Sequence, residues 1–338
     1  MAEIKNKVGC AGILVSDTFC GPMKELPREG QLLAVEALPT KAGGCAANVA
    51  IDLAKQGIHV EIAGCLGNDA SAKVLLASLE AHGVACDRIV YSDKLPTSKT
   101  VILLVEGQDR RYIHSFGANA GFTVSDIDRD WVRGLGVFYL GGLFLMPEFD
   151  VDEFLDLLRD CRKHGVVTVV DVVIPQNSAL PANLGTLLQE IDYFLPNDDE
   201  ASRLTGFSDP FMQLHKLLEW GMHPSGEHPM GEYPSGGQTV MITRGRHGVL
   251  AGRDGRYWQA GIYPGIQLVD PSGSGDAFAA GVIAGVMRGW EVPRILQYAS
   301  ALGASAIQTL GTTDGVFSAA QAEEFMVKNP LAISEGIL

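Results

Sequence analysis

Short runs of apolar and β-branched residues alternate along this chain with segments in which apolar residues recur at helical spacing. Such alternation is typical of parallel strands joined by right-handed helical crossovers. The run at residues 166–173 is nearly continuous valine, as in a strand buried on both faces. The pattern predicts an α/β fold with a central, mostly parallel sheet flanked by helices. We expect strands at residues 8–15, 60–65, 137–140, 166–173, 193–195 and 239–243, and helices at residues 46–56, 70–82, 152–164, 277–288 and 294–309.

Two parts of the chain interrupt this alternation. Residues 18–39 have an extended polar–apolar pattern, and residues 97–106 and 110–116 flank the turn Gly107-Gln108-Asp109, a pattern typical of a β-hairpin. Together these parts, at about 18–39 and 97–117, predict a small β-sheet that closes over a substrate as a lid. An ordinary hairpin at the edge of the main sheet explains the same pattern equally well.

Composition narrows the class of protein. The net charge of −14 repels phosphate backbones and anionic lipid, so nucleic acid and membrane surfaces are not expected partners. No apolar stretch reaches the ~20 residues of a spanning helix, and no signal peptide is expected. The six cysteines are scattered without a C-x-x-C pair, which favours reduced thiols in the cytoplasm over disulfides or a structural zinc site.

The segment at residues 221–238 is rich in Gly, Pro and His and has no periodicity. It predicts a long surface loop. His223 and His228 lie in it, but their spacing matches no standard metal site, so a flexible loop is the stronger interpretation.

The strongest chemical pattern is the stretch from Asp270 to Phe278, DPSGSGDAF, which precedes a helix of small residues. Gly273 and Gly275 let backbone N–H groups converge at the helix start, where the macrodipole also favours an anion. Asp276 in the first turn would face that anion as a base for phosphoryl transfer. The alternative is an ordinary acidic residue in the first turn of a helix.

Four further patterns follow or precede predicted strands and helices. The first three have structural alternatives: a glycine turn for the first, an N-terminal capping box for the second and a hairpin turn for the third. Their functional interpretations are a polyol-binding turn, a carboxylate that organises Mg²⁺ through water, a nucleotide-contact loop, and a ligand site at a strand end. The patterns are Gly43-Gly44-Cys45-Ala46-Ala47-Asn48, Pro196-Asn197-Asp198-Asp199-Glu200, Thr243-Arg244-Gly245-Arg246-His247-Gly248, and Asp17 after the first strand. No P-loop and no dinucleotide-binding G-x-G-x-x-G is present.

These patterns, in this order, resemble the ribokinase (PfkB) carbohydrate kinase family over nearly the whole chain. Residues 43–57 resemble its first signature and residues 270–285 its second, usually written D-T-x-G-A-G-D. Pro196–Glu200 resembles its magnesium-related motif, and Gly117-Ala118-Asn119-Ala120 a substrate-contact segment after the lid hairpin. The resemblance implies one ribokinase-like domain over residues 1–338, with the lid inserted in it, and ATP-dependent phosphorylation of a hydroxyl, expected to be primary, on a small sugar.

The resemblance also implies roles for individual residues, with ATP and Mg²⁺ as cofactors and a homodimer formed through the lid. Asp276 is the expected base, and Gly273, Ser274 and Gly275 form the anion hole. Asp17, Gly43, Gly44, Asn48 and Asn119 are expected to bind the sugar. Asn197, Thr243, Gly245 and Gly248 are expected at ATP, Glu200 at Mg²⁺ through water, and Asp270 and Ser272 at the position of a K⁺ site found in several members.

The acceptor substrate stays open. A ribokinase- or fructokinase-like member would act on ribose, fructose or a related ketose. A nucleoside kinase would use aromatic lid residues such as Phe19, Tyr112 and Phe116. A sugar-phosphate or sugar-acid kinase would use Lys99, Arg110 and Arg111 on the lid. The remote alternatives are a non-catalytic sugar sensor, against which Asp276 and Glu200 argue, and a dehydrogenase.

Overall fold

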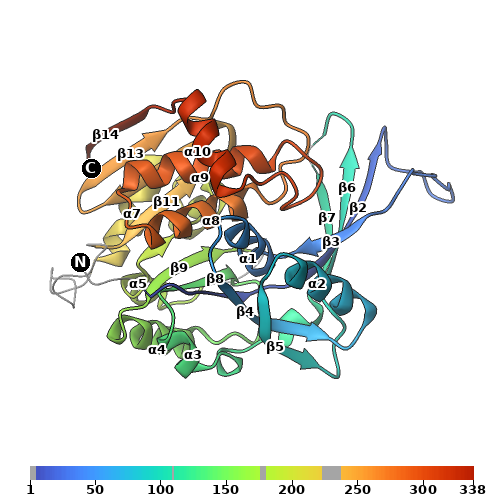
Figure 1. The fold of residues 1–338 in the computed structure, drawn as a ribbon, viewed down its shortest axis with the longest axis horizontal. Coiled ribbons are helices and arrows are strands. Elements are labelled where there is room, and N and C mark those ends of the chain that lie inside the picture. The colour runs from blue at the N-terminus through green and yellow to red at the C-terminus, as the bar shows by residue number, and fades with distance from the viewer. Residues whose placement is uncertain (1–4, 109, 176–179, 223–236) are drawn as a thin grey trace.

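A ten-stranded sheet forms the centre of the computed structural model, which describes residues 5–108, 110–175, 180–222 and 237–338 (Figure 1). Its order is β14-β13-β12-β11-β10-β9-β8-β1-β4-β5. The strands are β1 (Val8–Gly12), β4 (Val60–Gly67), β5 (Ala85–Ser92), β8 (Val137–Leu143), β9 (Val167–Val172), β10 (Tyr193–Phe194), β11 (Thr239–Thr243), β12 (Val249–Arg253), β13 (Arg256–Ala260) and β14 (Ile333–Ile337).

All pairings from β11 through β10, β9, β8, β1 and β4 to β5 are parallel, and those from β11 to β14 are antiparallel. The mostly parallel sheet predicted from the alternation is therefore confirmed. Every strand that the apolar runs predicted is present, with ends that differ by a few residues. β12 was expected only as the second strand of a possible hairpin after residues 239–243, and β5, β13 and β14 were not predicted, because they are partly exposed and carry polar residues.

Two helical layers cover the sheet, and each encloses its own apolar core (Figure 1). The alternation within β9 shows both, since Val167 and Val169 pack into one core and Val170 and Val172 into the other. One layer contains α1 (Cys45–Lys55), α2 (Ala70–Ala81), α8 (Ser274–Met287), α9 (Val292–Ala306) and α10 (Ala319–Lys328), and the other contains α3 (Arg129–Arg133), α4 (Val151–Lys163), α5 (Leu184–Gln189), α6 (Asp198–Thr205) and α7 (Pro210–Gly221).

The small residues of α8 let it approach α9 closely. A Cβ on Gly281 would lie 2.4 Å from the Cα of Ala299, so the backbones are in contact there. This packing buries most of α8 behind its first turn and fixes the direction in which its N-terminus points. The glycine-rich turn before α8 is therefore held by the core rather than by its own loop.

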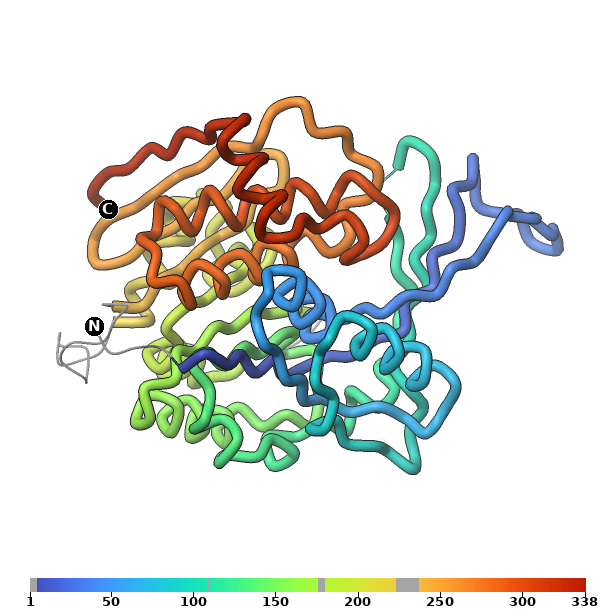
Figure 2. Tube along the Cα trace, viewed as in Figure 1, coloured from blue at the N-terminus to red at the C-terminus, as the bar shows by residue number. Residues whose placement is uncertain are grey.

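Two hairpin-like parts of the chain project beside the main body (Figure 2). They form a second sheet of four strands in the order β3-β2-β6-β7. Its strands are β2 (Val15–Met23), β3 (Thr40–Gly43), β6 (Lys99–Val105) and β7 (Arg111–Ser115), and we call it the lid sheet. The expected hairpin is present as β6 and β7. The expected bounds of 18–39 differ from the structure: β2 begins earlier, β3 lies just beyond, and residues 24–39 between them form no strand.

Residues 223–236 lie outside the described residues, and with them His223, His228 and most of the loop expected at 221–238. Within the described ranges, no helix has both the length and the apolarity needed to cross a bilayer.

Candidate functional site

The turn before α8 has the backbone geometry that an anion site requires. Gly273 is the N-cap of α8 with φ of 77°, and a Cβ there would lie 2.0 Å from the carbonyl oxygen of Thr312. Only glycine fits this position without strain. A Cβ on Gly275 would meet no atom within 4 Å, so the first turn of α8 borders open space. Its N–H groups have no intrahelical acceptors, and Ser274 lies between the two glycines.

Asp276 lies in this first turn and is half-buried. Its Oδ2 accepts a 2.7 Å hydrogen bond from Nδ2 of Asn48. Burial raises the pKa of Asp276, and hydrogen bonds from Asn48 and Cys45 act in the opposite direction. A carboxylate with a raised pKa at the positive end of a helix is equipped to orient a hydroxyl and accept its proton.

Asn48 is fixed by a residue that the sequence analysis did not single out. Its Oδ1 accepts a 2.9 Å hydrogen bond from the hydroxyl of Thr312. The neighbouring Gly311 donates its N–H to Oδ2 of Asp270 over 3.1 Å, and Oδ1 of Asp270 accepts from the N–H of Ser272 over 3.0 Å. The loop around residues 311–312 therefore connects the turn before α8 to α1.

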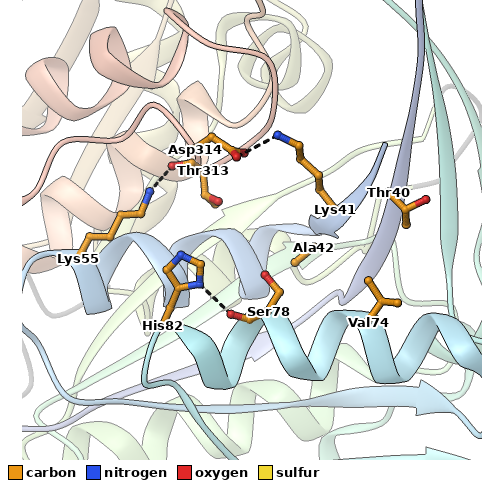
Figure 3. A pocket seen from close by; sticks show the side chains of 9 residues that line it. All are labelled: Thr40, Lys41, Ala42, Lys55, Val74, Ser78, His82, Thr313 and Asp314. Carbon is orange, nitrogen blue, oxygen red and sulfur yellow. Dashed lines mark hydrogen bonds and ion pairs between the residues drawn. The ribbon is translucent and has the colours of Figure 1, made fainter. Parts of the chain in front are cut away.

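A cavity of about 340 Å³ lies behind this loop, between β3, the end of α1, and α2 (Figure 3). Lys41 reaches across it to Oδ1 of Asp314 at 2.9 Å and to the carbonyl oxygen of Leu310 at 2.9 Å, and Lys55 donates to the carbonyl oxygen of Thr313. None of the predicted site residues lines this cavity. Its two lysines instead anchor the loop that carries Thr312. The lining residues are Thr40, Lys41, Ala42, Lys55, Val74, Ser78, His82, Thr313 and Asp314.

Cys45 and Asp171 accompany the predicted base. The thiol of Cys45 and one carboxylate oxygen each of Asp171 and Asp276 lie within 4.8 Å of one another. Cys45 begins α1, and Asp171 lies near the end of β9 on the side that faces α1 and α8. Burial raises the pKa of the Cys45 thiol, so it stays protonated and donates to the carboxylates.

Glu200 extends this acidic group toward α6. Asn197 caps α6: its Oδ1 accepts from the N–H of Glu200, and its own N–H donates to Oε2 of Glu200, each over 2.9 Å. The predicted capping box is therefore confirmed. Burial raises the pKa of Glu200 to about 7. Burial also raises the pKa of Asp171, and repulsion from Glu200 and Asp276 adds to this effect.

The turn after β11 brings the predicted nucleotide-contact residues beside Asn197. Thr243 pairs with Asn197, and the N–H of Thr243 donates to the carbonyl oxygen of Pro196 over 3.1 Å. Gly245 and Gly248 both have positive φ, and a Cβ on Gly248 would lie 2.0 Å from the carbonyl oxygen of Ala260. The turn joins β11 to its antiparallel neighbour β12, so the hairpin interpretation is correct. It also lies at the same edge as Glu200.

Asp17 projects from β2 of the lid sheet against the first glycine turn. A Cβ on Gly43 would lie 1.9 Å from Oδ2 of Asp17, and one on Gly44 would lie 2.5 Å from the carbonyl oxygen of Ile13. Both glycines are required for this close approach. Burial raises the pKa of Asp17 to about 7, and the charge of Asp276 adds to the rise, which places these two carboxylates in one electrostatic neighbourhood.

Asn119 is buried in the 3₁₀ turn after β7, and its side chain bonds to the backbone of Leu14. Its Oδ1 accepts from the N–H of Leu14 over 3.1 Å, and its Nδ2 donates to the carbonyl oxygen of Leu14 over 3.0 Å. These bonds join the lid to the junction of β1 and β2. They give Asn119 a structural task, and its contact with sugar remains a prediction.

The candidate site therefore contains a series of carboxylates, from Asp17 on the lid sheet through Asp276 to Glu200, beside the N-terminus of α8. The family model for pfkB family carbohydrate kinases matches residues 5–318. This chain belongs to that family. It is therefore an ATP-dependent carbohydrate kinase.

Relatives of this pfkB kinase agree with that assignment. It is 28% identical over 295 residues to ribokinase of Arabidopsis thaliana, covering 86% of this chain and 73% of the relative. It is 25% identical over 303 residues to 2-dehydro-3-deoxygluconokinase of Bacillus subtilis, covering 85% and 87%. The structure of A. thaliana ribokinase complexed with ribose and ATP superposes with a TM-score of 0.76 at 25% identity, covering 95% of this chain and 98% of that one. The ribokinase-like fold is thus confirmed.

The sequence analysis did not predict three residues of the candidate site of this pfkB kinase. Asp171 is the one charged residue in the valine-rich run at 166–173, and a carboxylate at the end of a buried strand was a usable signal. Cys45 lies inside the first signature, but was interpreted only as one of six reduced thiols. Thr312 had no signal, because its contact with Asn48 spans 264 positions of sequence.

Proposed function

We propose that this kinase transfers the terminal phosphoryl group of ATP to a hydroxyl, expected to be primary, of a small sugar bound between Asp17 and Asp276. The observation that carries the proposal is the half-buried Asp276 at the N-terminus of α8, hydrogen-bonded by Asn48 over 2.7 Å. The carboxylate orients the sugar hydroxyl and takes its proton as the oxygen–phosphorus bond forms, while the bond to the leaving ADP oxygen breaks.

The first turn of α8 supplies the complementary charge. The N–H groups of residues 273–275 are directed to the phosphoryl oxygens, and the helix dipole adds to their effect. The tight approach of Gly273 to Thr312 keeps these donors in place before substrate arrives. ATP is proposed to lie along Asn197, Thr243, Gly245 and Gly248, so that its phosphates reach this turn.

The acidic residues between the first turn of α8 and the proposed ATP site have the oxygen ligands that a hard divalent cation prefers. Glu200 and Asp171 offer carboxylate oxygens, and burial raises the pKa of both, so a neighbouring cation would favour their ionised forms. Mg²⁺, when bound with ATP, neutralises phosphate charge. Glu200 is proposed to hold it through water, because the α6 cap already uses Oε2. Asp171 joins Glu200 in this proposal.

A K⁺ site at Asp270 and Ser272 is a further part of the proposal. The hydroxyl of Ser272 is shielded and has no hydrogen-bond partner among the described residues, and Asp270 is buried beside it. An orphaned oxygen beside a carboxylate suits a monovalent cation. The test is the activity ratio in KCl and NaCl, compared between the wild type and Ser272→Ala.

The sugar is proposed to contact Asp17, Gly43, Gly44, Asn48 and Asn119, under the lid sheet. The whole of residues 1–338 is proposed to act as one kinase domain in the cytoplasm, and the lid sheets of two copies to form a homodimer. The exposed Ile113, 62% accessible on the lid sheet, supports such a contact. Light scattering of the purified protein measures its mass and tests the dimer.

The function is tested by ADP release with MgATP and a panel of neutral sugars, sugar phosphates, sugar acids and nucleosides. We expect turnover with a neutral sugar such as ribose or fructose. Turnover with nucleosides alone would move the acceptor to the nucleoside class. A sugar acid is a second candidate, since the B. subtilis relative is named for one. ATP binding without turnover of any acceptor would contradict the proposal.

A further inference from the structure

Four polar side chains form a single row across the lid sheet. Lys41 on β3, Asp17 on β2, Thr100 on β6 and His114 on β7 are direct partners in the strand register. Directly paired residues on neighbouring strands project from the same face of a sheet. Thr100 and His114 therefore share the face of the lid that carries Asp17.

Hydrogen bonds within this row determine which ring nitrogen of His114 carries hydrogen. Thr100 lies directly beside Asp17 in the strand register and lowers the pKa of its carboxyl, so we assign the hydroxyl hydrogen of Thr100 to Asp17. The Thr100 oxygen is then an acceptor, and Nδ1 of His114 lies 3.1 Å from it. Nδ1 is thus the protonated nitrogen. Partial burial lowers the pKa of His114, so the ring is neutral and Nε2 is a bare acceptor.

Among the described residues, no hydrogen-bond donor faces Nε2 of His114. Nε2 of His114 is shielded from solvent and has no hydrogen-bond partner among the described residues. The ring of Phe116 packs edge-on against His114 at 5.2 Å between centroids and carries no polar hydrogen. A shielded acceptor without a donor costs free energy, which a ligand that brings a hydrogen recovers.

We propose that Nε2 of His114 accepts a hydrogen bond from a hydroxyl of the same sugar that Asp17 binds, and that the two side chains together select a neutral polyol. This inference rests on the proposed function, because it takes the Asp17 face of the lid as the sugar-facing one. A carboxylate or phosphate at this place would set its acceptor oxygens against Nε2 and the Asp17 carboxylate, and would be rejected.

Two of the three lid cations agree with this selection. Lys99 pairs with Ser16 and Ser115, one position away from the Asp17 row, so it projects from the opposite face of the lid. Arg111 is three positions from His114 on β7 and projects from that opposite face as well. Of the three cations that a sugar-acid or sugar-phosphate kinase would use, Lys99 and Arg111 are therefore directed away from Asp17, whereas Arg110 contacts Tyr112. Lys41, on the Asp17 face, is already bonded to Asp314.

The test compares two variants that separate the ring nitrogens. His114→Asn keeps a donor near the position of Nδ1 for Thr100 and removes the group at Nε2, whereas His114→Gln restores a polar group near Nε2. The substrates are D-ribose, D-fructose, each of their monodeoxy analogues, and 2-dehydro-3-deoxygluconate. The melting temperature of both variants is measured alongside, so that a folding defect is recognised.

We expect the wild type to use a neutral sugar and to lose about tenfold to hundredfold in kcat/KM on one monodeoxy analogue, the loss typical of a buried group left without its partner. His114→Asn should show a similar rise in KM on the parent sugar, a smaller change in kcat, and no further loss on that analogue. His114→Gln should recover part of the loss. A purely structural role would not erase discrimination at one hydroxyl.

Three results would overturn the inference. If His114→Asn discriminates among all deoxy analogues as the wild type does, the inference fails alone and the proposed function stands. If the wild type prefers 2-dehydro-3-deoxygluconate to both neutral sugars, the selection of a neutral polyol is wrong. If the wild type phosphorylates none of these compounds although it binds ATP, the proposed function and the inference fail together.

Discussion

The side-chain amide of Asn48 donates to Oδ2 of Asp276 over 2.7 Å, and these residues are 228 positions apart in the chain. The bond joins α1 to the first turn of α8. Because Asn48 also accepts from Thr312, its amide orientation is fixed, and Asp276 has a defined direction before any substrate binds. The proposed base of this kinase is therefore positioned by the fold rather than by the ligand.

Removal of the Cys45 thiol should change the pH dependence of the reaction. The hydrogen bond from Cys45 lowers the pKa of Asp276 against the effect of burial. In Cys45→Ala the pKa of Asp276 rises, and since the base must be ionised, the acidic limb of the kcat/KM profile should move to higher pH. Cys45→Ser retains a donor and should stay near the wild type. Superimposable profiles for all three proteins would show that the thiol does not act on the base.

Substitution of Gly273 and of Gly275, the two glycines of the proposed anion hole, should have different effects on stability and on catalysis. Gly273→Ala places a methyl group in a left-handed conformation against Thr312 and should lower the free energy of unfolding by about 1–3 kcal/mol. The methyl group of Gly275→Ala meets no neighbouring atom, so the free energy of unfolding should stay within about 0.5 kcal/mol of the wild type. The same methyl group would occupy the space proposed for phosphate, so kcat should fall. Denaturant unfolding and kinetics are compared. Equal stability of the two variants would refute the strain at Gly273.

Glu200→Gln should weaken the response to Mg²⁺ without loss of the helix cap. Glutamine at this position can still accept from the N–H of Asn197, so α6 should keep its stability. Loss of the charge should raise the Mg²⁺ concentration for half-maximal activity about 10- to 100-fold, as for other outer-sphere partners of a metal. The exposed Asp199→Asn is the charge-matched control. If both variants give the same Mg²⁺ titration as the wild type, Glu200 has no metal role.

The free enzyme should lose stability as pH rises through the acidic and neutral range. Burial raises the pKa of Asp17 and of Glu200 to about 7, whereas an unfolded carboxyl titrates near 4. The folded state then binds more protons than the unfolded state between about pH 4 and pH 7, so this contribution is complete below pH 4 and is lost by about pH 7. Asp17→Asn should flatten the slope of unfolding free energy against pH. An equal slope in the wild type and in Asp17→Asn would contradict this contribution of Asp17.

Much of this fold could be predicted because its strands are marked by composition. The valine run at 166–173 and the helical spacing of apolar residues at 70–82 and 152–164 are local signals, and the structure confirms these three elements. The lid register could not be predicted in this way. The pairing of Asp17 with Thr100 depends on strands more than 80 positions apart, and no single residue encodes it.

The candidate site could be predicted only in part, for the same reason. Asp276 and Asn48 lie next to glycines whose spacing is chemically unusual, and the structure brings these two residues together. Asn119 was predicted to face substrate, but its amide is engaged with the backbone of Leu14, a contact that no local pattern announces. Asp171 was not predicted, because residues 166–173 were interpreted only as a buried strand.

The central claim, that Asp276 is the base, is tested most directly by Asp276→Asn measured for both turnover and binding on the acceptor that the wild type phosphorylates. The amide keeps the shape of the side chain and cannot accept the proton, so kcat should fall by about 10²- to 10⁴-fold. The dissociation constants of ATP and sugar, and the melting temperature, should change little. A kcat near that of the wild type would contradict the account.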